Sequence, residues 1–311
     1  MTKPTIAVLM GGKSAEREIS LQSGAGVSKA LASLGYPAKH FDYDDGLVEA
    51  LQRAKPAAVF NALHGGAGED GSVQALLDWL GIGYQGSGVR ACAVAMDKWQ
   101  TKALLVAEGL PCPRGIRLRV ADAASFPVVE KFGLPCVVKP SAQGSAVGVG
   151  LVRAPSDWPA AVANASIGAA DILVEEYIEG REFTVAILGD EALPLVEITP
   201  HDTFYTYRAK YTVGGSTHTV PAGLDPALSK SMQRDALVLH RALGARDYSR
   251  VDIMLRTSGP YAILECNTLP GLTPLSLFPD AARAAGISYD TLIERLLVCA
   301  LSRSSGRFSV L

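Results

Sequence analysis

The chain has 311 residues, of which 48% are apolar and 19% charged, and its formal net charge is -2. At roughly 100–200 residues per domain, this composition predicts two or three domains with a sizeable core. It offers no basic field for nucleic acid or an anionic membrane, so we expect neither as a partner. The five cysteines are scattered without a Cys-x-x-Cys pair, which disfavours a zinc site or a disulfide framework and fits a reducing cytoplasm. The apolar run 6–10 is too short for a signal peptide or a membrane span.

The first third of the chain alternates between strand and helix patterns. Strands are predicted at 5–10 and 57–63, and helices at 19–34 and 72–80. Glycines follow both strands. Such an alternation predicts a parallel sheet with ligand-facing loops at the carboxyl ends of its strands.

The middle of the chain reads as a second block of helix and strands. Asp97 is a candidate N-cap for a helix that extends to Glu108, before Gly109 and Pro111. Short strands are predicted at 135–139, 149–153 and 172–176, the first two on either side of a Gly/Ser-rich loop.

The last third begins with apolar strand patterns at 183–188 and 193–198. The stretch 200–220 is polar and aromatic without a clear period, and a loop of that length in a compact protein is usually functional or disordered. A helix is predicted at 226–243, and paired strands at 251–255 and 261–266. The remaining residues are helical up to a ragged end.

Two nucleotide-binding patterns are incomplete and are rejected. Gly12-Lys13-Ser14 resembles the end of a P-loop, but Ala7 stands where the first glycine is required. The stretch from Gly81 to Gly86 matches G-x-G-x-x-G, yet it follows a helix rather than a strand. We interpret it as a helix stop and a turn.

A group of oxygen-bearing side chains on the two late strands suggests a metal site. Glu265 and Asn267 are two apart in a strand and therefore face the same side. Asp252 lies on the neighbouring strand among apolar residues, where a carboxylate is costly unless it is paired or metal-bound. Oxygen ligands suit Mg²⁺, which completes its shell with water and substrate phosphates. The alternative is a structural ion pair between Arg250 and Asp252, with Glu265 on a solvated face.

Other segments have features suited to a nucleotide. Lys139 ends a strand before the small-residue loop 140–148, whose backbone N–H groups could approach phosphates, and Lys98 offers a second cation. The backbone of 175–178, after a strand, could read an adenine edge, and Glu182 could bind ribose hydroxyls. Taken alone, these charges fit an ordinary solvated surface equally well.

Five separated motifs, in this order, resemble the D-alanine–D-alanine ligases of the ATP-grasp family over nearly the whole chain. The motifs are Met10–Ser20, His64–Gly71, Lys139–Gly148, Ala209–Tyr211 and Glu265–Gly271. The resemblance implies an α/β ATP-grasp fold. Its parts would be a doubly wound N-terminal substrate domain (1–95), a central domain (96–181) and a C-terminal catalytic domain (182–311) with a lid loop (200–220). The two α+β domains would clasp ATP. It also implies a cytoplasmic homodimer in peptidoglycan precursor synthesis.

The same resemblance implies a role for each matching position. The metal ligands, for two Mg²⁺ or Mn²⁺ ions, would be Asp252, Glu265 and Asn267. The ATP contacts would be Lys98, Lys139, Ser145, Glu175, Glu176, Tyr177, Ile178 and Glu182. Glu16 would hold the ammonium group of the first D-alanine near His64, and Ser145 and Tyr211 would hydrogen-bond towards Glu16. Arg250 and Gly271 would form the oxyanion site, Ser276 and Leu277 would bind the second D-alanine's carboxylate, and Lys210 would lie beside Tyr211 on the lid.

The implied chemistry is ATP-dependent formation of D-alanyl-D-alanine through an acyl phosphate. Ligases that use D-lactate or D-serine as the second substrate are the nearest alternative, and Tyr211 favours the plain dipeptide. An ATP-grasp carboxylase leaves Glu16 and His64 without a role. An inactive nucleotide-binding regulator would have no need for the metal ligands and both lysines.

Overall fold

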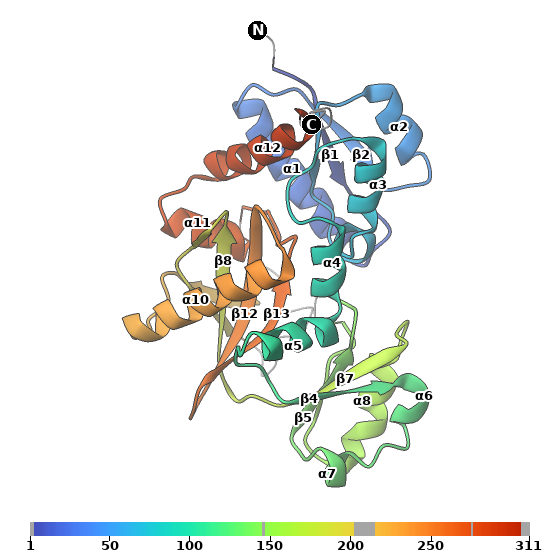
Figure 1. Cartoon of the computed structure of the whole chain (residues 1–311), viewed down its shortest axis with the longest axis vertical. Helices are drawn as coiled ribbons and strands as arrows, with labels where there is room; N and C mark the ends of the chain where they lie inside the picture. Colours follow the sequence, from blue (N-terminus) through green and yellow to red (C-terminus); the bar gives the residue numbers. More distant parts are fainter. Residues whose placement is uncertain (1–2, 145–146, 202–214, 275, 306–311) are drawn as a thin grey trace.

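The computed structural model describes residues 3–144, 147–201, 215–274 and 276–305, and its three sheets follow one another along the molecule (Figure 1). The N-terminal sheet lies at one end, the four-stranded middle sheet at the other, and the six-stranded sheet between them. The N-terminus and the C-terminal helix meet at the same end, because α12 packs against α1 and β3. Predictions for Ser145, Lys210 and Tyr211 lie outside the described residues.

The N-terminal unit has a parallel sheet, as the sequence predicts, and the order of its strands is β2-β1-β3. Its strands are β1 (Ile6–Met10), β2 (Ala38–Asp42) and β3 (Ala58–Asn61), and its helices are α1 (Arg17–Ser33), α2 (Leu47–Ala54), α3 (Ser72–Leu80) and α4 (Val89–Met96), with a 3₁₀ turn at Gly66–Gly68. The strands β1 and β3 are buried on both faces, which explains their apolar runs, whereas the edge strand β2 is partly exposed. Gly81 ends α3 with a φ of 79°, so the G-x-G-x-x-G pattern is a helix stop.

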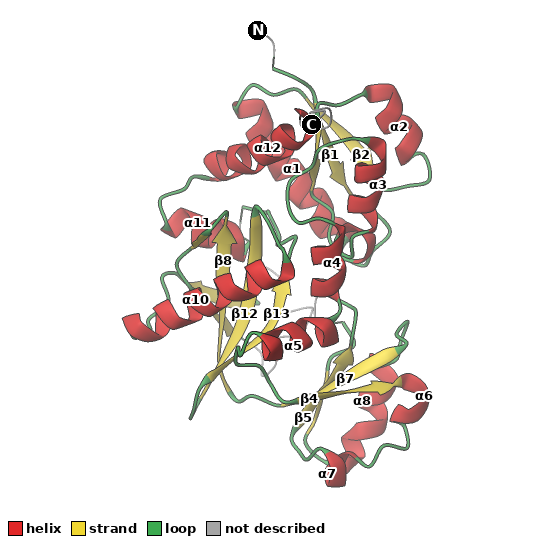
Figure 2. Ribbon diagram, viewed as in Figure 1, coloured by secondary structure: helices red, strands yellow, loops and turns green. Residues whose placement is uncertain are grey.

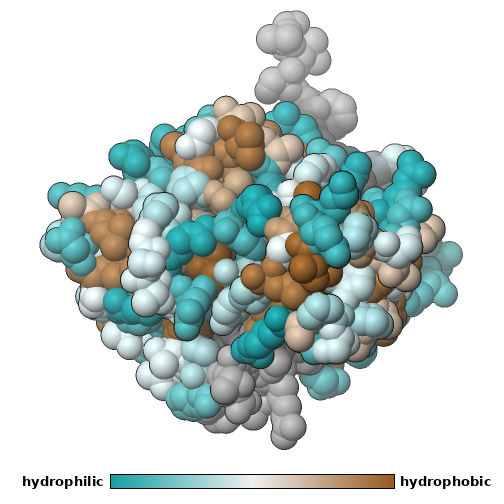
Figure 3. All heavy atoms as spheres, turned by 90° about the horizontal axis from the view of Figure 1, so that it is seen from below, coloured by the Kyte–Doolittle hydropathy of each residue, from teal (hydrophilic) through white to brown (hydrophobic). Residues whose placement is uncertain are grey.

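The middle unit has an antiparallel sheet in the order β4-β7-β5-β6 (Figure 2). The helix α5 (Lys98–Ala107) leads into this unit and packs on the core of the C-terminal sheet. The unit's own elements are β4 (Gly115–Arg119), α6 (Val120–Ala123), α7 (Val128–Lys131), β5 (Cys136–Pro140), β6 (Gly150–Val152), a 3₁₀ turn (Pro155–Asp157), α8 (Trp158–Ala165) and β7 (Asp171–Glu176). The predicted strands are thus confirmed within a few residues. On the outer face of this end, hydrophilic residues separate the hydrophobic patches (Figure 3).

The C-terminal unit has a six-stranded antiparallel sheet in the order β11-β10-β8-β12-β13, with β9 paired to β8. Its elements are β8 (Gly180–Leu188), β9 (Glu191–Ala192), β10 (Val196–Pro200), β11 (Ser216–Thr219), α10 (Pro226–Leu243), β12 (Tyr248–Arg256), β13 (Tyr261–Asn267), α11 (Leu277–Ala284) and α12 (Tyr289–Ser305). Within the described residues, no helix is long and apolar enough to span a membrane.

Apolar side chains alternate along β8, β12 and β13, so that one face of the six-stranded sheet is buried against α10. Val185, Val251 and Cys266 belong to a core that includes Met232 and Leu239 of α10. Cys266 is therefore a packing residue, and its burial raises the pKa of its thiol to about 12. The opposite face carries the polar side chains Thr184, Arg250 and Asp252, whereas Ala186, Leu188 and Tyr248 of the same strands pack in a core with α11.

The N-cap of α5 couples this helix to the middle sheet. Oδ1 of Asp97 accepts hydrogen bonds from the backbone N–H groups of Trp99 and Gln100, and from Oγ of Ser141 at 2.9 Å. The predicted cap is thus confirmed. It fixes the first turn of α5, and with it the direction of Lys98.

We expect Asp97→Ala to lower the free energy of unfolding by about 1–2 kcal/mol, since it removes both a cap and a tertiary hydrogen bond. Urea denaturation measures the change. Asp225→Ala is the matched control, because Asp225 caps α10 through Ala227 and Leu228. An equal or smaller loss for Asp97→Ala would contradict the coupling to Ser141.

Candidate active site

The polar face of the six-stranded sheet gathers the predicted metal ligands. Asp252 of β12 stands directly opposite Glu265 of β13, and Arg250 stands opposite Asn267. Directly opposite residues have Cβ atoms about 4.5–5.5 Å apart and point to the same face. Two carboxylates, one amide and one guanidinium therefore share a small area of the sheet.

Asp252 is almost fully buried, at 4% exposure, and is well supported by hydrogen bonds. Its Oδ1 accepts from Oγ1 of Thr184 and from Nε of Arg250, both at 2.8 Å, and its Oδ2 lies 2.8 Å from Nη2 of Arg250. The ion pair that was the alternative to a metal site is thus present. It does not exhaust the carboxylate, because two oxygens offer about four lone-pair positions.

The donor set on this face fits a magnesium ion. Glu265 is partly exposed, with its Oε2 3.4 Å from Nζ of Lys98, and Oδ1 of Asn267 accepts a hydrogen bond from the N–H of Leu269. Asp252, Glu265 and Asn267 would all ligate a metal through oxygen atoms, which Mg²⁺ prefers. Within the described residues, no three His, Cys, Asp or Glu side chains cluster as metal ligands. A cation here would therefore need the Asn267 amide, water or substrate oxygens to complete its shell.

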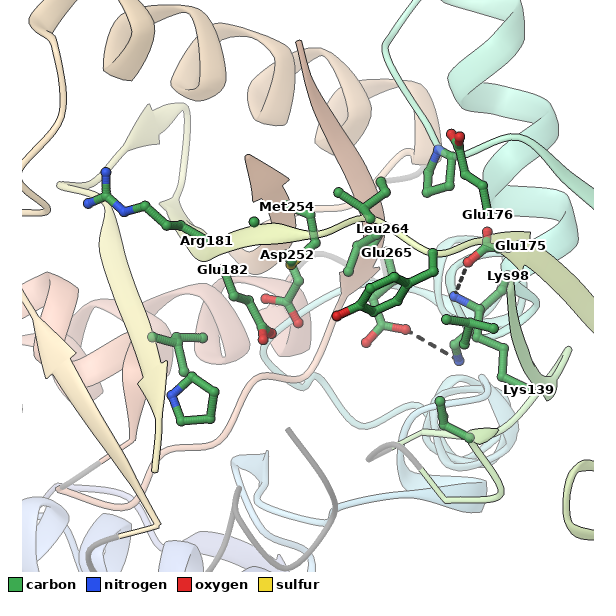
Figure 4. Close-up of a pocket in the computed structure, with 18 of the residues that line it drawn as sticks. Lys98, Lys139, Glu175, Glu176, Arg181, Glu182, Asp252, Met254, Leu264 and Glu265 are labelled. Carbon is green, nitrogen blue, oxygen red and sulfur yellow. Dashed lines mark ion pairs between the residues drawn. The ribbon is translucent and has the colours of Figure 1, made fainter. Parts of the chain in front are cut away.

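A pocket with a volume of about 390 Å³ lies between this sheet and the middle sheet (Figure 4). Most of the residues predicted to bind ATP, and two of the predicted metal ligands, form its wall. These are Lys98, Lys139, Glu175, Glu176, Tyr177, Ile178, Glu182, Asp252 and Glu265. Apolar side chains such as Val137, Met254 and Leu264 complete the wall. A pocket with apolar side chains and two lysines in its wall suits a base joined to phosphates.

The two predicted phosphate-binding lysines enter the pocket from different elements. Lys98 opens α5, and its Nζ donates to the backbone carbonyl of Gln143 at 2.5 Å. Lys139 lies near the end of β5, and its Nζ is 2.5 Å from Oε2 of Glu175. Both ammonium groups are thus held in the pocket by oxygen partners, as the dashed lines in Figure 4 mark for Glu265 and Glu175.

Glu175, which the sequence predicts as an ATP contact, lines the pocket and is paired with two lysines. Its carboxylate lies between Lys102 and Lys139, at 2.6 and 2.5 Å. Burial raises the pKa of Glu175, yet the two ammonium groups outweigh burial, so the net pKa is below its usual value. The carboxylate is therefore ionised in the folded protein and forms an ion pair with each lysine.

Glu176 connects the middle unit to the C-terminal sheet. Its Oε1 accepts from the N–H of Arg114 and lies 2.6 Å from Nη2 of Arg256. The ion pair between Glu176 and Arg256 lies at the start of the segment 177–179, which joins β7 to β8. Burial raises the pKa of Glu176, and the hydrogen bonds from Arg114 and Arg256 lower it to below its usual value. Glu176 thus holds the pocket wall together where the two units meet.

A second cluster lies at the carboxyl ends of β1 and β3. Glu16 and His64 are both buried, at 6% exposure. Nε2 of His64 forms a 2.9 Å hydrogen bond with Oγ of Ser23, and its Nδ1 lies 3.8 Å from Oε1 of Glu69. Two carboxylates beside an imidazole form a site suited to an ammonium group.

Glycines bring this cluster next to the pocket and to the C-terminal unit. A Cβ added to Gly144 would lie 4.0 Å from Oε2 of Glu16, and the preceding Gln143 lines the pocket. A Cβ added to Gly271 would lie 3.0 Å from Oγ of Ser276 and 3.9 Å from Cε1 of His64. The predicted residues therefore converge from all three units, and the absence of side chains at 144 and 271 permits the close approach.

Sequence reasoning missed three side chains of this region. Lys102 follows Lys98 by one helical turn, a spacing that places both on one face of α5. Glu69 lies inside the motif 64–71 but received no role. Thr184, which supports Asp252, sits beside it in the β8–β12 register, which the sequence could not supply.

Comparisons with known proteins agree with this geometry. Residues 104–298 match the family model described as the C-terminal part of D-Ala–D-Ala ligases. The chain is 45% identical over 302 residues to the D-alanine–D-alanine ligase of Geobacter sulfurreducens, covering 97% of this chain and 95% of the relative. It belongs to the D-alanine–D-alanine ligase family.

Solved structures of family members share the whole fold. The D-alanine–D-alanine ligase of Bacillus anthracis, in complex with ATP, is 30% identical with a TM-score of 0.86, covering 98% of this chain and 100% of that chain. The VanG D-Ala:D-Ser ligase of Enterococcus faecalis is 26% identical with a TM-score of 0.82, covering 96% and 99%. The predicted ATP-grasp fold is therefore confirmed.

Proposed function

We propose that this chain uses ATP to join two D-alanine molecules into D-alanyl-D-alanine, for peptidoglycan precursors. One observation carries the proposal. Asp252 and Glu265 share a pocket with Lys98 and Lys139, and the loop after Lys139 approaches Glu16 of the N-terminal unit. A triphosphate site thus adjoins a site for an ammonium group.

The reaction requires an activated acid, because a carboxylate does not react with an amine at neutral pH. A carboxylate oxygen of the first D-alanine attacks the γ-phosphorus of ATP, and the bond to ADP breaks, which gives an acyl phosphate. The amine of the second D-alanine then attacks the acyl carbon and loses a proton, and phosphate leaves. The products are one dipeptide, one ADP and one phosphate.

The residues of the pocket would divide this work by position. Lys98 and Lys139 hold the phosphates, and Glu182 and the segment 175–178 hold the nucleoside. Glu16, beside His64, holds the ammonium group of the first D-alanine. This placement directs its carboxylate towards the γ-phosphate.

The C-terminal unit would serve the second step. Arg250 and the backbone N–H of Gly271 stabilise the oxyanion that forms on the acyl carbon. Ser276, at the N-cap of α11, and Leu277 receive the carboxylate of the second D-alanine, where the N-terminal end of a helix favours an anion. The proximity of Gly271 to Ser276 supports one site for both functions.

Asp252, Glu265 and Asn267 would hold Mg²⁺ or Mn²⁺, two ions in the family's pattern. A metal bound there would neutralise charge on the transferring phosphoryl group. Water must also be excluded, because acyl phosphates hydrolyse readily. We assign that task to the stretch 200–220, whose described end, β11, pairs with β10. We further propose that the chain has three domains, 1–95, 96–181 and 182–311, and that it works as a homodimer in the cytoplasm.

Sequence similarity favours D-alanine over D-serine or D-lactate as the second substrate. Curated relatives near 45% identity over nearly the whole chain are named D-alanine–D-alanine ligases, whereas the D-Ala:D-Ser ligase is 26% identical. An inactive regulator is disfavoured, because the chain keeps both lysines and every predicted metal ligand.

A phosphate-release assay with ATP tests the proposal. D-Alanine should stimulate phosphate release, whereas L-alanine should leave it at background, since only the D-isomer directs its carboxylate correctly while its ammonium group stays at Glu16. D-Lactate or D-serine added to a limiting amount of D-alanine should not increase the rate. Release that requires one of these second substrates would identify a sibling ligase, and no release with any of them would contradict ligase activity.

A further inference from the structure

Lys102 is a buried lysine behind the pocket, and the mechanism above gives it no role. Its side chain is only 8% exposed, and its Nζ donates to the carbonyl oxygen of Pro113 at 2.6 Å. The same Nζ lies 2.6 Å from Oε1 of Glu175. A buried ammonium group is costly unless it is paired, so these contacts fix its position.

Lys102, Glu175 and Lys139 form a closed group that we call the Glu175 clamp. Glu175 receives one ammonium group on each oxygen, at 2.6 Å from Lys102 and 2.5 Å from Lys139. Glu175 and Lys139 line the pocket, as Figure 4 shows, whereas Lys102 is not part of the described wall. The clamp carries two positive charges against one negative charge, so a single positive charge remains.

The surrounding backbone leaves little room for the clamp to rearrange. A Cβ added to Gly115 would lie 3.1 Å from Cε of Lys102 and 3.3 Å from Cγ of Glu175. Gly115 is also the register partner of Glu175 across β4 and β7. Lys102 and Glu175 thus pack against Gly115 of β4, and Lys139 pairs with Glu175 on the side of the pocket.

We propose that Lys102 is a positioning residue for the nucleotide, which neutralises Glu175 from behind so that Lys139 can give its charge to a phosphate. The proposal rests on the proposed use of ATP. Lys102 touches neither nucleotide nor amino acid. It acts through Glu175, which in turn sets the position and the available charge of Lys139.

The proposal follows from what Glu175 would require without Lys102. A buried carboxylate that loses one of two cations must rely on the remaining cation. Lys139 would then be committed to Glu175, and the clamp would carry no net charge to offer an anion. Replacing Glu175 with neutral glutamine removes that demand, so the loss caused by removing Lys102 should largely disappear.

A double-mutant cycle measures this coupling. The affinity for Mg-ADP is determined by calorimetry for the original chain, Lys102→Met, Glu175→Gln and the double variant. We expect Lys102→Met alone to weaken binding about tenfold, or about 1.4 kcal/mol, and to weaken it less than about threefold when residue 175 is glutamine. The proposal would be overturned if Lys102→Met weakened Mg-ADP binding by the same factor with glutamate and with glutamine at position 175. It would also be overturned if Lys102→Met alone did not weaken binding.

Steady-state kinetics separate positioning from general damage. Lys102→Met should raise KM for ATP and leave KM for D-alanine within about twofold, whereas a disturbed fold would change both. Lys131→Met is the matched control, because Lys131 is an exposed lysine of the middle unit and should keep both constants. If Lys102→Met does not fold, Lys102→Gln replaces it, since glutamine keeps a donor for Pro113 without the charge.

The outcome for the original chain distinguishes the two proposals. If it neither binds Mg-ADP nor releases phosphate with D-alanine, the proposed function fails. If it does both and Lys102→Met behaves like it, only the role of Lys102 is wrong.

Discussion

Replacing Glu265 with glutamine should lower D-alanine-dependent ADP formation by about a thousandfold or more, because a metal that stabilises the phosphoryl group contributes several kcal/mol. Glu265 lines the pocket opposite Asp252, on the face where the oxygen donors meet. Glutamine keeps the size of the side chain but removes the negative charge that would hold a divalent cation and that pairs with Lys98. A coupled assay of ADP formation measures the effect.

Two further measurements separate metal binding from folding. Binding of Mn²⁺ in the presence of ADP, followed by electron paramagnetic resonance, should weaken in Glu265→Gln. Glu191→Gln is the control, because Glu191 is an exposed residue of β9 in the same sheet and should keep both activity and Mn²⁺ binding. Near-normal turnover of a folded Glu265→Gln protein would reject the metal assignment.

The substitution Arg250→Lys should lower kcat by about a hundredfold, the usual effect of losing one donor to a developing oxyanion. Arg250 binds both oxygens of Asp252 through Nε and Nη2, and its planar guanidinium fixes that carboxylate in one orientation. Lysine keeps the charge but makes neither the paired hydrogen bonds nor the fixed fork. KM for ATP should change much less than kcat, because Arg250 does not line the described pocket wall.

A matched substitution tests whether this loss is specific to the site. Arg241→Lys changes another arginine that pairs with an aspartate, Asp190, but at an exposed position and 3.5 Å apart. An exposed ion pair contributes little to stability, so Arg241→Lys should keep the kcat of the original chain. If Arg250→Lys kept kcat within about twofold, the oxyanion role would be wrong.

The sequence predicts elements well where both ends carry local signals. The helices α3 and α10 begin and end as predicted, because Gly81 and Gly244 stop them and Asp225 caps α10. The pairing of β12 with β13 was also foreseen. The edge strand β2 and the helix α4 were missed, because the first alternates weakly between charged and apolar residues and the second is rich in small apolar residues without a polar stripe.

The candidate site was predictable where residues are close in sequence and much less where they meet through tertiary packing. Spacing in one strand was enough to place Glu265 and Asn267 on one face. The Glu175 clamp joins α5, β5 and β7, so no local pattern could reveal it. The same holds for Thr184 beside Asp252 and for the approach of Gly144 to Glu16, which depend on register and on the contact between units.

The acyl phosphate is best tested by following oxygen atoms through the reaction. D-Alanine labelled with ¹⁸O in its carboxylate is incubated with ATP and the protein, and the released phosphate is analysed by mass spectrometry. If the carboxylate attacks the γ-phosphorus in the pocket beside Glu16, each phosphate carries one ¹⁸O atom and one D-alanyl-D-alanine forms per phosphate. Dipeptide formation with unlabelled phosphate would show that the acid is activated in another way.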